Sequence, residues 1–409
     1  MSSIDSVSDR DRRIDPPGAL GRTPLWVIFG LAMGPAVALG LARFAYALLL
    51  PAMRSDLAWS FADAGAMNTA NAAGYLFGAL AAAPLGKRVG DKSVFAISLL
   101  LTALSVSVSG LYSDFVAMLG VRLLAGVTGA LAFVTGAGIT SAAAAGGSQT
   151  RASTFLGVYF SGAGIGIGAS ALAVPPLLGI AGWRAGWLVL GVLSLLATLF
   201  ACVALKRSPV PAYVSSNHAR DGWSPRFMAP ELVAYALFGA GYITYATFII
   251  AFLRSAQGFS SAELSAFWAL LGMSSIAAAF AWGPVLGRLK GGAGTALTIG
   301  TVAVGAALAL LCTSRIGAYA SAILFGGSFL SVIAAVTAFA RRAAQPRAWT
   351  AAIAALTIAF GLGQCIGPLL SGALSDGANG VRTGIWLSVG ILMAACAIAA
   401  CQREPSPAE

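Results

Sequence analysis

Two arginines lie within apolar stretches that contain no acidic residue, and they are the side chains best suited to hold a charged ligand. Arg43 falls in the apolar run 25–50 and Arg122 in the run 115–145. Burying one arginine in a bilayer costs roughly 2.5–3.5 kcal/mol on insertion scales, so each cation needs a compensating interaction. A guanidinium is planar, permanently charged and suited to bidentate binding of a carboxylate or phosphate. The pair therefore predicts a site for an organic anion.

The two arginines are expected at the same depth. Arg43 lies eight residues before Pro51, where the first apolar run ends, and Arg122 lies eight residues after Asp114, where the fourth begins. At a rise of 1.5 Å per residue, both lie about 12 Å below the outer surface. That distance exceeds the easy reach of an arginine side chain, which disfavours snorkelling. The alternative for each arginine is a packing or gating role, through bonds to backbone carbonyls or neighbouring polar groups.

Polar and aromatic side chains in the other apolar runs could complete this site. Tyr46 lies one helical turn from Arg43 and shares its face, and Tyr242 and Tyr245 form an i, i+3 pair. The alternative for each is an interhelical hydrogen bond or an interfacial aromatic. The predicted substrate-binding set is Arg43, Arg122, Tyr46, Asn71, Tyr75, Tyr159, Tyr242, Tyr245 and Gln364.

A repeat of 200 residues links two parts of the chain. The frame of residues 54–63 returns at 254–263. In it, Ser60-x-x-Asp63 and Ser260-x-x-Glu263 both fit the pattern of a helix-start capping box. Asp63 is also the candidate for proton coupling, although capping is its more common role. A long-period repeat in an apolar protein indicates two similar membrane halves.

Other chemistries find no support in the sequence. The acidic residues fall in tails, loops or helix ends, and the single histidine, His218, lies in a polar linker. The five cysteines have no metal-ligand spacing. The glycine run 162–168 lacks the βαβ context of a nucleotide site, so we expect it to serve helix packing. We predict no enzyme, no metal and no cofactor, because a membrane-embedded enzyme needs a nucleophile with a base, paired carboxylates or metal ligands.

Composition requires that lipid be the solvent of this chain. Hydrophobic residues make up 58% of the 409 residues and charged residues 10%, against roughly 25% charged residues in soluble proteins. A helix needs about 20 apolar residues to cross a bilayer, which gives twelve spans and an all-α integral membrane fold. The predicted spans are 25–50, 61–85, 93–110, 115–145, 152–179, 185–205, 231–253, 263–286, 293–313, 316–340, 347–372 and 383–402.

The spans divide into two six-helix halves. We predict a cytoplasmic tail 1–24 without signal-peptide features, an N-terminal half 25–205, a cytoplasmic linker 206–230, a C-terminal half 231–402 and a cytoplasmic tail 403–409. With the N-terminus inside, the cytoplasmic segments hold 18 Lys and Arg and the opposite side holds 5. The positive-inside rule therefore predicts that both termini are cytoplasmic. This distribution of the +11 net charge over short loops also argues against a nucleic-acid partner.

Several strings resemble the major facilitator superfamily along nearly the whole chain. Arg122-x-x-x-Gly126 is similar to its arginine motif, and Gly182-Trp183-Arg184 is another common feature. The loop 85–92 fits the gating-loop motif only in part, because Lys87 stands where Asp is usual. Strings similar to the YbfB/YjiJ-type bacterial branch occur at 40–46, 71–75, 324–329 and 363–368.

The resemblance implies the major facilitator fold, with two pseudo-symmetric halves related by an axis along the membrane normal. It also implies that spans one, four, seven and ten line a central cavity, which places Arg43 and Arg122 on its wall. From this follows the leading hypothesis, a secondary transporter of the bacterial inner membrane that moves a small organic anion by alternating access, through proton symport or exchange. We expect a monomer in the lipid bilayer. The alternatives are efflux of neutral or amphipathic compounds and a non-transporting membrane sensor.

Overall fold

The structure, a computed structural model, describes residues 23–145, 148–209, 222–345, 348–378 and 380–404. In these ranges the chain forms helices and no strand, which confirms the predicted all-α class. Nearly all of the predicted N-terminal tail, the centre of the linker with His218, and the end of the C-terminal tail lie outside the described residues.

The N-terminal half comprises six α-helices and one π-helix. They are α1 (Leu25–Pro35), η1 (Ala36–Phe44), α2 (Tyr46–Asp56), α3 (Phe61–Val89), α4 (Asp91–Val108), α5 (Phe115–Ala144) and α6 (Gln149–Lys206).

The C-terminal half comprises seven α-helices in the described residues. They are α7 (Ala229–Gln257), α8 (Ser261–Leu286), α9 (Ala293–Leu311), α10 (Arg315–Gly326), α11 (Ser331–Ala343), α12 (Trp349–Ser375) and α13 (Val381–Ala400).

These helices are consistent with the twelve predicted spans. Ten stretches of the described chain are long and apolar enough to cross a membrane, with α1, η1 and α2 counted as one stretch and α10 with α11 as another. The stretch that contains α6 is long enough for two crossings, and Gly182 interrupts it with φ 72° and ψ −177°, at the boundary predicted between spans five and six. α3, with 29 residues, is long enough for a further crossing but is more polar than the other ten stretches.

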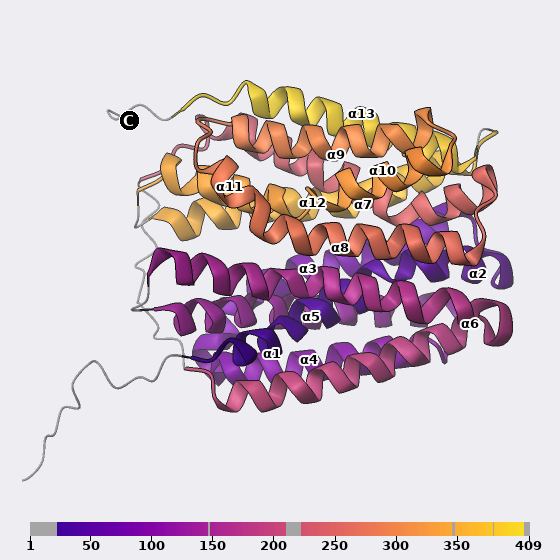
Figure 1. Cartoon of the computed structure of the whole chain (residues 1–409), viewed down its shortest axis with the longest axis horizontal. Helices are drawn as coiled ribbons and strands as arrows, with labels where there is room; N and C mark the ends of the chain where they lie inside the picture. The colour runs from indigo at the N-terminus through magenta and orange to yellow at the C-terminus, as the bar shows by residue number, and fades with distance from the viewer. Residues whose placement is uncertain (1–22, 146–147, 210–221, 346–347, 379, 405–409) are drawn as a thin grey trace, which may run out of the picture.

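The two halves form two layers. Figure 1 shows the N-terminal helices, indigo to magenta, below the C-terminal helices, orange to yellow. We call the end of the bundle that carries Thr23 and Glu404 the termini side, and the opposite end the far side. Arg151 at the start of α6 donates to the carbonyl of Thr23, and Gly292 before α9 donates to the carbonyl of Gln402, so both ends of the described chain are anchored there.

Glycines allow the halves to pack closely. Between the halves α3 contacts α12, α6 contacts α8, and α2 contacts α7. A Cβ on Gly65 of α3 would lie 2.3 Å from the carbonyl oxygen of Pro368 in α12, and a Cβ on Gly164 would lie 2.5 Å from that of Gly272 in α8. Gly162 packs against α1 in the same manner, because a Cβ added to it would lie 1.9 Å from the carbonyl oxygen of Ala32. The packing role predicted for the glycine run 162–168 is thereby confirmed.

Both predicted capping boxes are present on the far side. The hydroxyl of Ser60 accepts from the N–H of Asp63 at 3.0 Å, and the Asp63 carboxylate accepts from the N–H of Ser60 at 3.0 Å. Ser260 and Glu263 make the same reciprocal pair at the start of α8. The repeat in the sequence therefore corresponds to a repeated local structure.

Candidate functional site

Arg43 lies on the π-helical segment of the first crossing. The i→i+5 bonding of η1 ends where the N–H of Ala45 donates to the carbonyl of Gly40 at 3.0 Å. Such segments are rare and occur often at functional sites. Gly40 brings η1 against α6, because a Cβ there would lie 2.4 Å from the Cα of Gly166. The arginine is therefore carried by a tightly packed segment.

The guanidinium of Arg43 is buried and incompletely bonded. The residue is 2% exposed, and its Nε and Nη2 have no hydrogen-bond partner among the described residues. Its guanidinium carbon lies 5.4 Å from the centre of the Tyr75 ring, within cation–π range. The next residue, Phe44, packs edge-on against Phe329 of the other half, and Tyr242 stacks on the same Phe329 ring. The structure thus brings Arg43, Tyr75 and Tyr242 into one neighbourhood.

Arg122 makes one packing hydrogen bond and has further nitrogens that could bind a ligand. It is 3% exposed, and its Nη1 donates to the backbone carbonyl of Ala42 at 2.7 Å. Its guanidinium carbon lies 5.2 Å from the ring centre of Tyr46 and 5.3 Å from that of Trp187. Nε and Nη2 have no partner in the described part of the chain. The alternative of carbonyl bonding is therefore realised by one of its three nitrogens.

Tyr46 and Asn71 support Arg122 rather than Arg43. The hydroxyl of Tyr46 donates to the carbonyl of Ala64 at 2.9 Å, and its ring is the one that faces Arg122. The side chain of Asn71 donates to the carbonyl of Arg122 at 3.1 Å. The expectation that Tyr46 shares the face of Arg43 assumed α-helical spacing, and the wider turn of η1 before Ala45 changes that relation.

Two of the predicted tyrosines are held in helix packing. Tyr159 is fully buried and donates to the carbonyl of Phe133 at 2.7 Å. Tyr245 bonds the hydroxyl of Ser321 and stacks on Phe325, with ring centres 4.2 Å apart. Their hydroxyls already have hydrogen-bond partners within their own halves. The structure therefore favours the packing alternative for both, and their contact with a substrate stays a prediction.

Gln364 and Tyr242 are hydrogen-bonded polar residues of the predicted site in the C-terminal half. The amide nitrogen of Gln364 donates to the hydroxyl of Tyr242, while its buried Oε1 has no partner among the described residues. The halves meet close to this pair, since Asn68 of α3 donates to Thr247 of α7. This arrangement combines unpartnered donors on one half with an unpartnered acceptor on the other.

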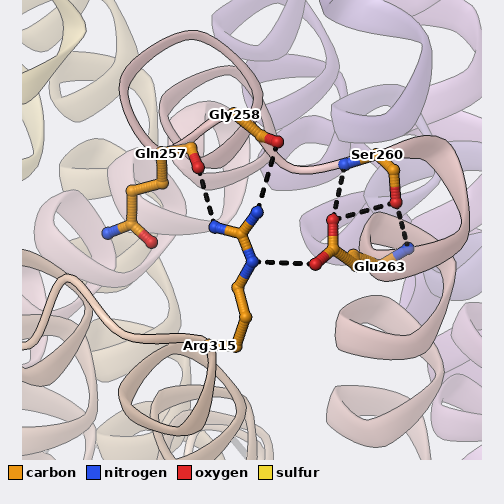
Figure 2. A network of polar contacts seen from close by, with 5 residues as sticks. All are labelled: Gln257, Gly258, Ser260, Glu263 and Arg315. Carbon is orange, nitrogen blue, oxygen red and sulfur yellow. Dashed lines mark hydrogen bonds and ion pairs between the residues drawn. The ribbon is translucent and has the colours of Figure 1, made fainter.

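Asp63 lies apart from this central group. Its Oδ2 accepts from the N–H and the hydroxyl of Ser60, at 3.0 and 2.8 Å, at the far-side end of α3. Glu263 occupies the corresponding place in the other half and also accepts from Nε of Arg315 at 2.7 Å (Figure 2). Arg315 donates further to the carbonyls of Gln257 and Gly258 and so joins the far-side ends of α7, α8 and α10. Both acids therefore organise far-side turns.

Glu231 is a buried acid that the sequence analysis placed at a helix end. It is 0% exposed in the first turn of α7 and accepts a hydrogen bond from the hydroxyl of Thr295 in α9. Its position after Ala229 and Pro230 resembles an ordinary solvent-facing helix start, which concealed the burial. The apolar residues that follow directly were the available signal, because they place the acid at the edge of a span.

Two membrane transporters of known structure are similar to this chain in the arrangement of their helices. A point mutant of the nucleoside transporter NupG matches with a TM-score of 0.72 at 16% identity, covering 92% of this chain and 98% of NupG. A bacterial homologue of the human lysosomal transporter Spinster, in an inward-facing and occupied conformation, matches with a TM-score of 0.71 at 16% identity. That match covers 93% of this chain and 98% of the homologue. At this identity the likeness establishes the fold alone, a bundle of helices in two halves.

The family follows from the sequence match. Residues 35–400 match the family described as the uncharacterised MFS-type transporter YbfB. The chain therefore belongs to this family of the major facilitator superfamily, and the resemblance drawn from its residue strings is confirmed. Family and structural neighbours are transporters rather than enzymes.

Proposed function

We propose that this transporter is a secondary active carrier that moves a small organic anion, carboxylate in character, by alternating access. One observation carries the proposal: Arg43 and Arg122 together keep four buried guanidinium nitrogens without a partner among the described residues. A buried, unpaired cation is costly, and a bidentate carboxylate would satisfy both its charge and its donors. Binding of the anion would thus offset the cost of burying the two unpaired guanidinium groups.

The surroundings of the arginines favour an anion with a planar or apolar body. Tyr242 stacks between Phe360 and Phe329, with ring centres 5.6 and 6.1 Å away. Phe329 lies edge-on to Phe44, the neighbour of Arg43, at 5.5 Å. Aromatic faces contribute large apolar contact areas at little entropic cost. We therefore expect the carboxylate to bind the N-terminal half and the body of the molecule to rest on the rings of the C-terminal half.

Transport of an anion into a cell requires a driving force. If the termini side is cytoplasmic, as the charge distribution predicts, the membrane potential opposes entry by about 2.3 kcal/mol per charge per 100 mV. Proton symport or exchange against an internal anion would supply that energy. Alternating access would expose the central group to each side in turn, as the two halves rock about it.

A binding screen on the purified protein tests the anion proposal. Ligands that bind the native state raise its melting temperature, so we expect stabilisation by monocarboxylates, and more by benzoate than by the non-planar cyclohexanecarboxylate. Arg43→Gln should weaken binding of the best carboxylate by about tenfold or more, equivalent to about 1.4 kcal/mol. Arg254→Gln, which changes an exposed far-side arginine, is the matched control and should bind as the unmodified protein does.

The principal alternative is export of neutral or amphipathic compounds. One structural relative is a transporter of nucleosides, and the stacked rings beside Tyr242 also suit an uncharged aromatic ligand. Vesicle flux separates the two: transport of a neutral compound that Arg43→Gln and Arg122→Gln leave unchanged would overturn the anion proposal. Binding without flux in the same vesicles would favour a membrane sensor.

A further inference from the structure

Glu231 is the one acidic residue among the described residues that is completely buried. It lies on the termini side, in the first turn of α7, and bonds to α9 and to the segment that follows α13. Its Oε1 accepts from the hydroxyl of Thr295 in α9, and its backbone N–H donates to Oε1 of Gln402 at 3.3 Å, in the segment that follows α13. Its Oε2 is buried and has no hydrogen-bond partner in the described chain.

A cation lies at the same end of the half but is bound to other groups. Arg342, at the end of α11, pairs through Nε with Oε1 of Glu404 at 3.4 Å, and its Nη2 donates to the carbonyl of Gly291 at 3.4 Å. The adjoining Gly292 donates to the carbonyl of Gln402, the residue that also accepts from the N–H of Glu231, so Arg342 belongs to the surroundings of this acid. Tyr235, one turn further along α7, is the next titratable side chain on the same face, and α9 contributes the neutral Thr295.

These contacts favour a neutral carboxylic acid. A buried carboxylate without an ion-pair partner carries a desolvation penalty of several kcal/mol. The first turn of a helix offers an anion typically 0.3–1 kcal/mol, and up to about 2 in partly buried geometries. The penalty is the larger effect, so burial favours the protonated form of Glu231, with the unpartnered Oε2 as the oxygen available for the proton.

We propose that Glu231 is a proton-binding site of the C-terminal half, which releases its proton to the termini side when Arg342 leaves Glu404. In that step the Oε2–H bond breaks, the proton passes to water, and the resulting carboxylate pairs with the Arg342 guanidinium. The segment around Gln402 must shift, because it covers the acid. Asp63, whose carboxylate is engaged in its capping box, is thereby replaced as the candidate group for proton coupling.

A row of rings links this site to the proposed substrate site. Tyr235, Phe238 and Tyr242 follow Glu231 at i+4, i+7 and i+11, on one face of α7. Tyr235 and Phe238 stack at 6.1 Å, and Phe238 and Tyr242 stack at 4.9 Å. A movement of the first turn of α7 on proton release is thus passed to Tyr242 and its partner Gln364. The coupling role rests on the proposed function, whereas the proton site itself does not.

Infrared difference spectroscopy between buffers of about pH 6 and about pH 9, where exposed carboxyl groups are already ionised, detects a buried carboxylic acid directly by its C=O stretching band. The full-length protein should show such a band, which disappears as the pH rises. Glu231→Gln should abolish it, and Glu263→Gln, an acid engaged at the far side, should preserve it. A band that persists in Glu231→Gln, or no band in the unmodified protein at any pH, overturns the proposal.

Two further variants keep the test valid if Glu231→Gln misfolds. Thr295→Val removes the hydroxyl that bonds Oε1 and should move the loss of the band to higher pH, since an ionised carboxylate gains most from that bond. Glu404→Gln frees Arg342 to pair with Glu231 and should move it to lower pH. Unchanged midpoints in both variants contradict the assignment. A Glu231 band without any carboxylate binding in the thermal screen would retain the proton site and reject the anion carrier.

Discussion

At the scale of single residues, Arg122 illustrates how one side chain serves packing and recognition together. One nitrogen bonds the carbonyl of Ala42, and the ring faces of Tyr46 and Trp187 accommodate the guanidinium plane. Two nitrogens remain without a partner among the described residues. A planar fork allows this division, because its donors point in fixed and different directions.

Replacing the planar guanidinium of Arg122 by the ammonium of a lysine separates its packing role from its role in ligand recognition. Arg122→Lys keeps the positive charge but offers a single ammonium, which cannot bond the Ala42 carbonyl and a carboxylate in the same geometry. We expect affinity for the best carboxylate to fall by about tenfold, less than on removal of the charge by Arg122→Gln. Isothermal titration of both variants measures the difference. Arg54→Lys, beside the Phe61 ring on the far side, should change nothing, and equal binding by all three variants would contradict a role for the fork.

Residue identity could be predicted from the sequence more readily than residue contacts. Arg43 and Arg122 stand out because charge within an apolar run has few explanations. The pairing of Tyr46 with Arg122 could not be predicted, because it depends on a π-helical segment that no residue pattern announced. Glu231 was missed for a related reason: burial at a helix end depends on Thr295 and Gln402, which lie 64 and 171 positions away in the chain.

At the scale of elements, the position of Arg43 depends on the contact between η1 and α6. Both surfaces are glycine at the closest point, where a Cβ on Gly40 would lie 2.4 Å from the Cα of Gly166. The glycine-rich run was correctly assigned to packing from composition alone. Its partner helices, α1 with η1 on one face and α8 on another, follow from the fold and not from the run itself.

Addition of one methyl group tests this contact. In Gly40→Ala the Cβ would meet backbone atoms of α6, which cannot rotate away, so the helices must separate. We expect a loss of about 1–3 kcal/mol of stability, typical of overpacking, and weaker carboxylate binding because Arg43 moves with η1. Thermal unfolding in detergent measures the first effect and the ligand-induced shift the second.

Gly168→Ala provides the control on the same helix pair. A Cβ at Gly168 meets nothing within 4 Å, and alanine is favoured over glycine in a helix by roughly 0.5–1 kcal/mol. This variant should be as stable as the unmodified protein or slightly more so. If Gly40→Ala behaved in the same way, the close approach of η1 and α6 would not determine the position of Arg43.

At the scale of the whole molecule, the carboxylate of Asp376 links the two halves on the far side. Asp376, after α12, accepts from the backbone N–H of Phe61 at 2.7 Å and of Ala62 at 3.0 Å. These are first-turn donors of α3 that have no partner within their own helix. Gly372 packs on the same turn, with a Cβ position 2.4 Å from the carbonyl oxygen of Phe61. One half thus caps a helix of the other.

The two-halved fold could be predicted from the 200-residue repeat and the apolar spans, but this contact could not. Asp376 follows its span as an ordinary loop acid, and nothing near it in the sequence refers to Phe61, which lies 315 positions away. In the proposed alternating-access cycle the contacts between the halves change, so a helix pattern within each half carries little information about them.

Removal of this cap should release the far side. Asp376→Ala leaves two first-turn donors of α3 to water, while Asp376→Asn keeps one acceptor oxygen and should have a smaller effect. Because the carboxylate is exposed, we expect a shift of about 1 kcal/mol, which changes the ratio of closed to open molecules roughly fivefold. Distances between spin labels at Leu57 and Ala378, in a background without the native cysteines, measure the two populations. Asp114→Ala removes a cap within one half, at the start of α5, and should leave the distribution unchanged; an equal shift there would mean that general loosening, not the bond between the halves, opens the far side.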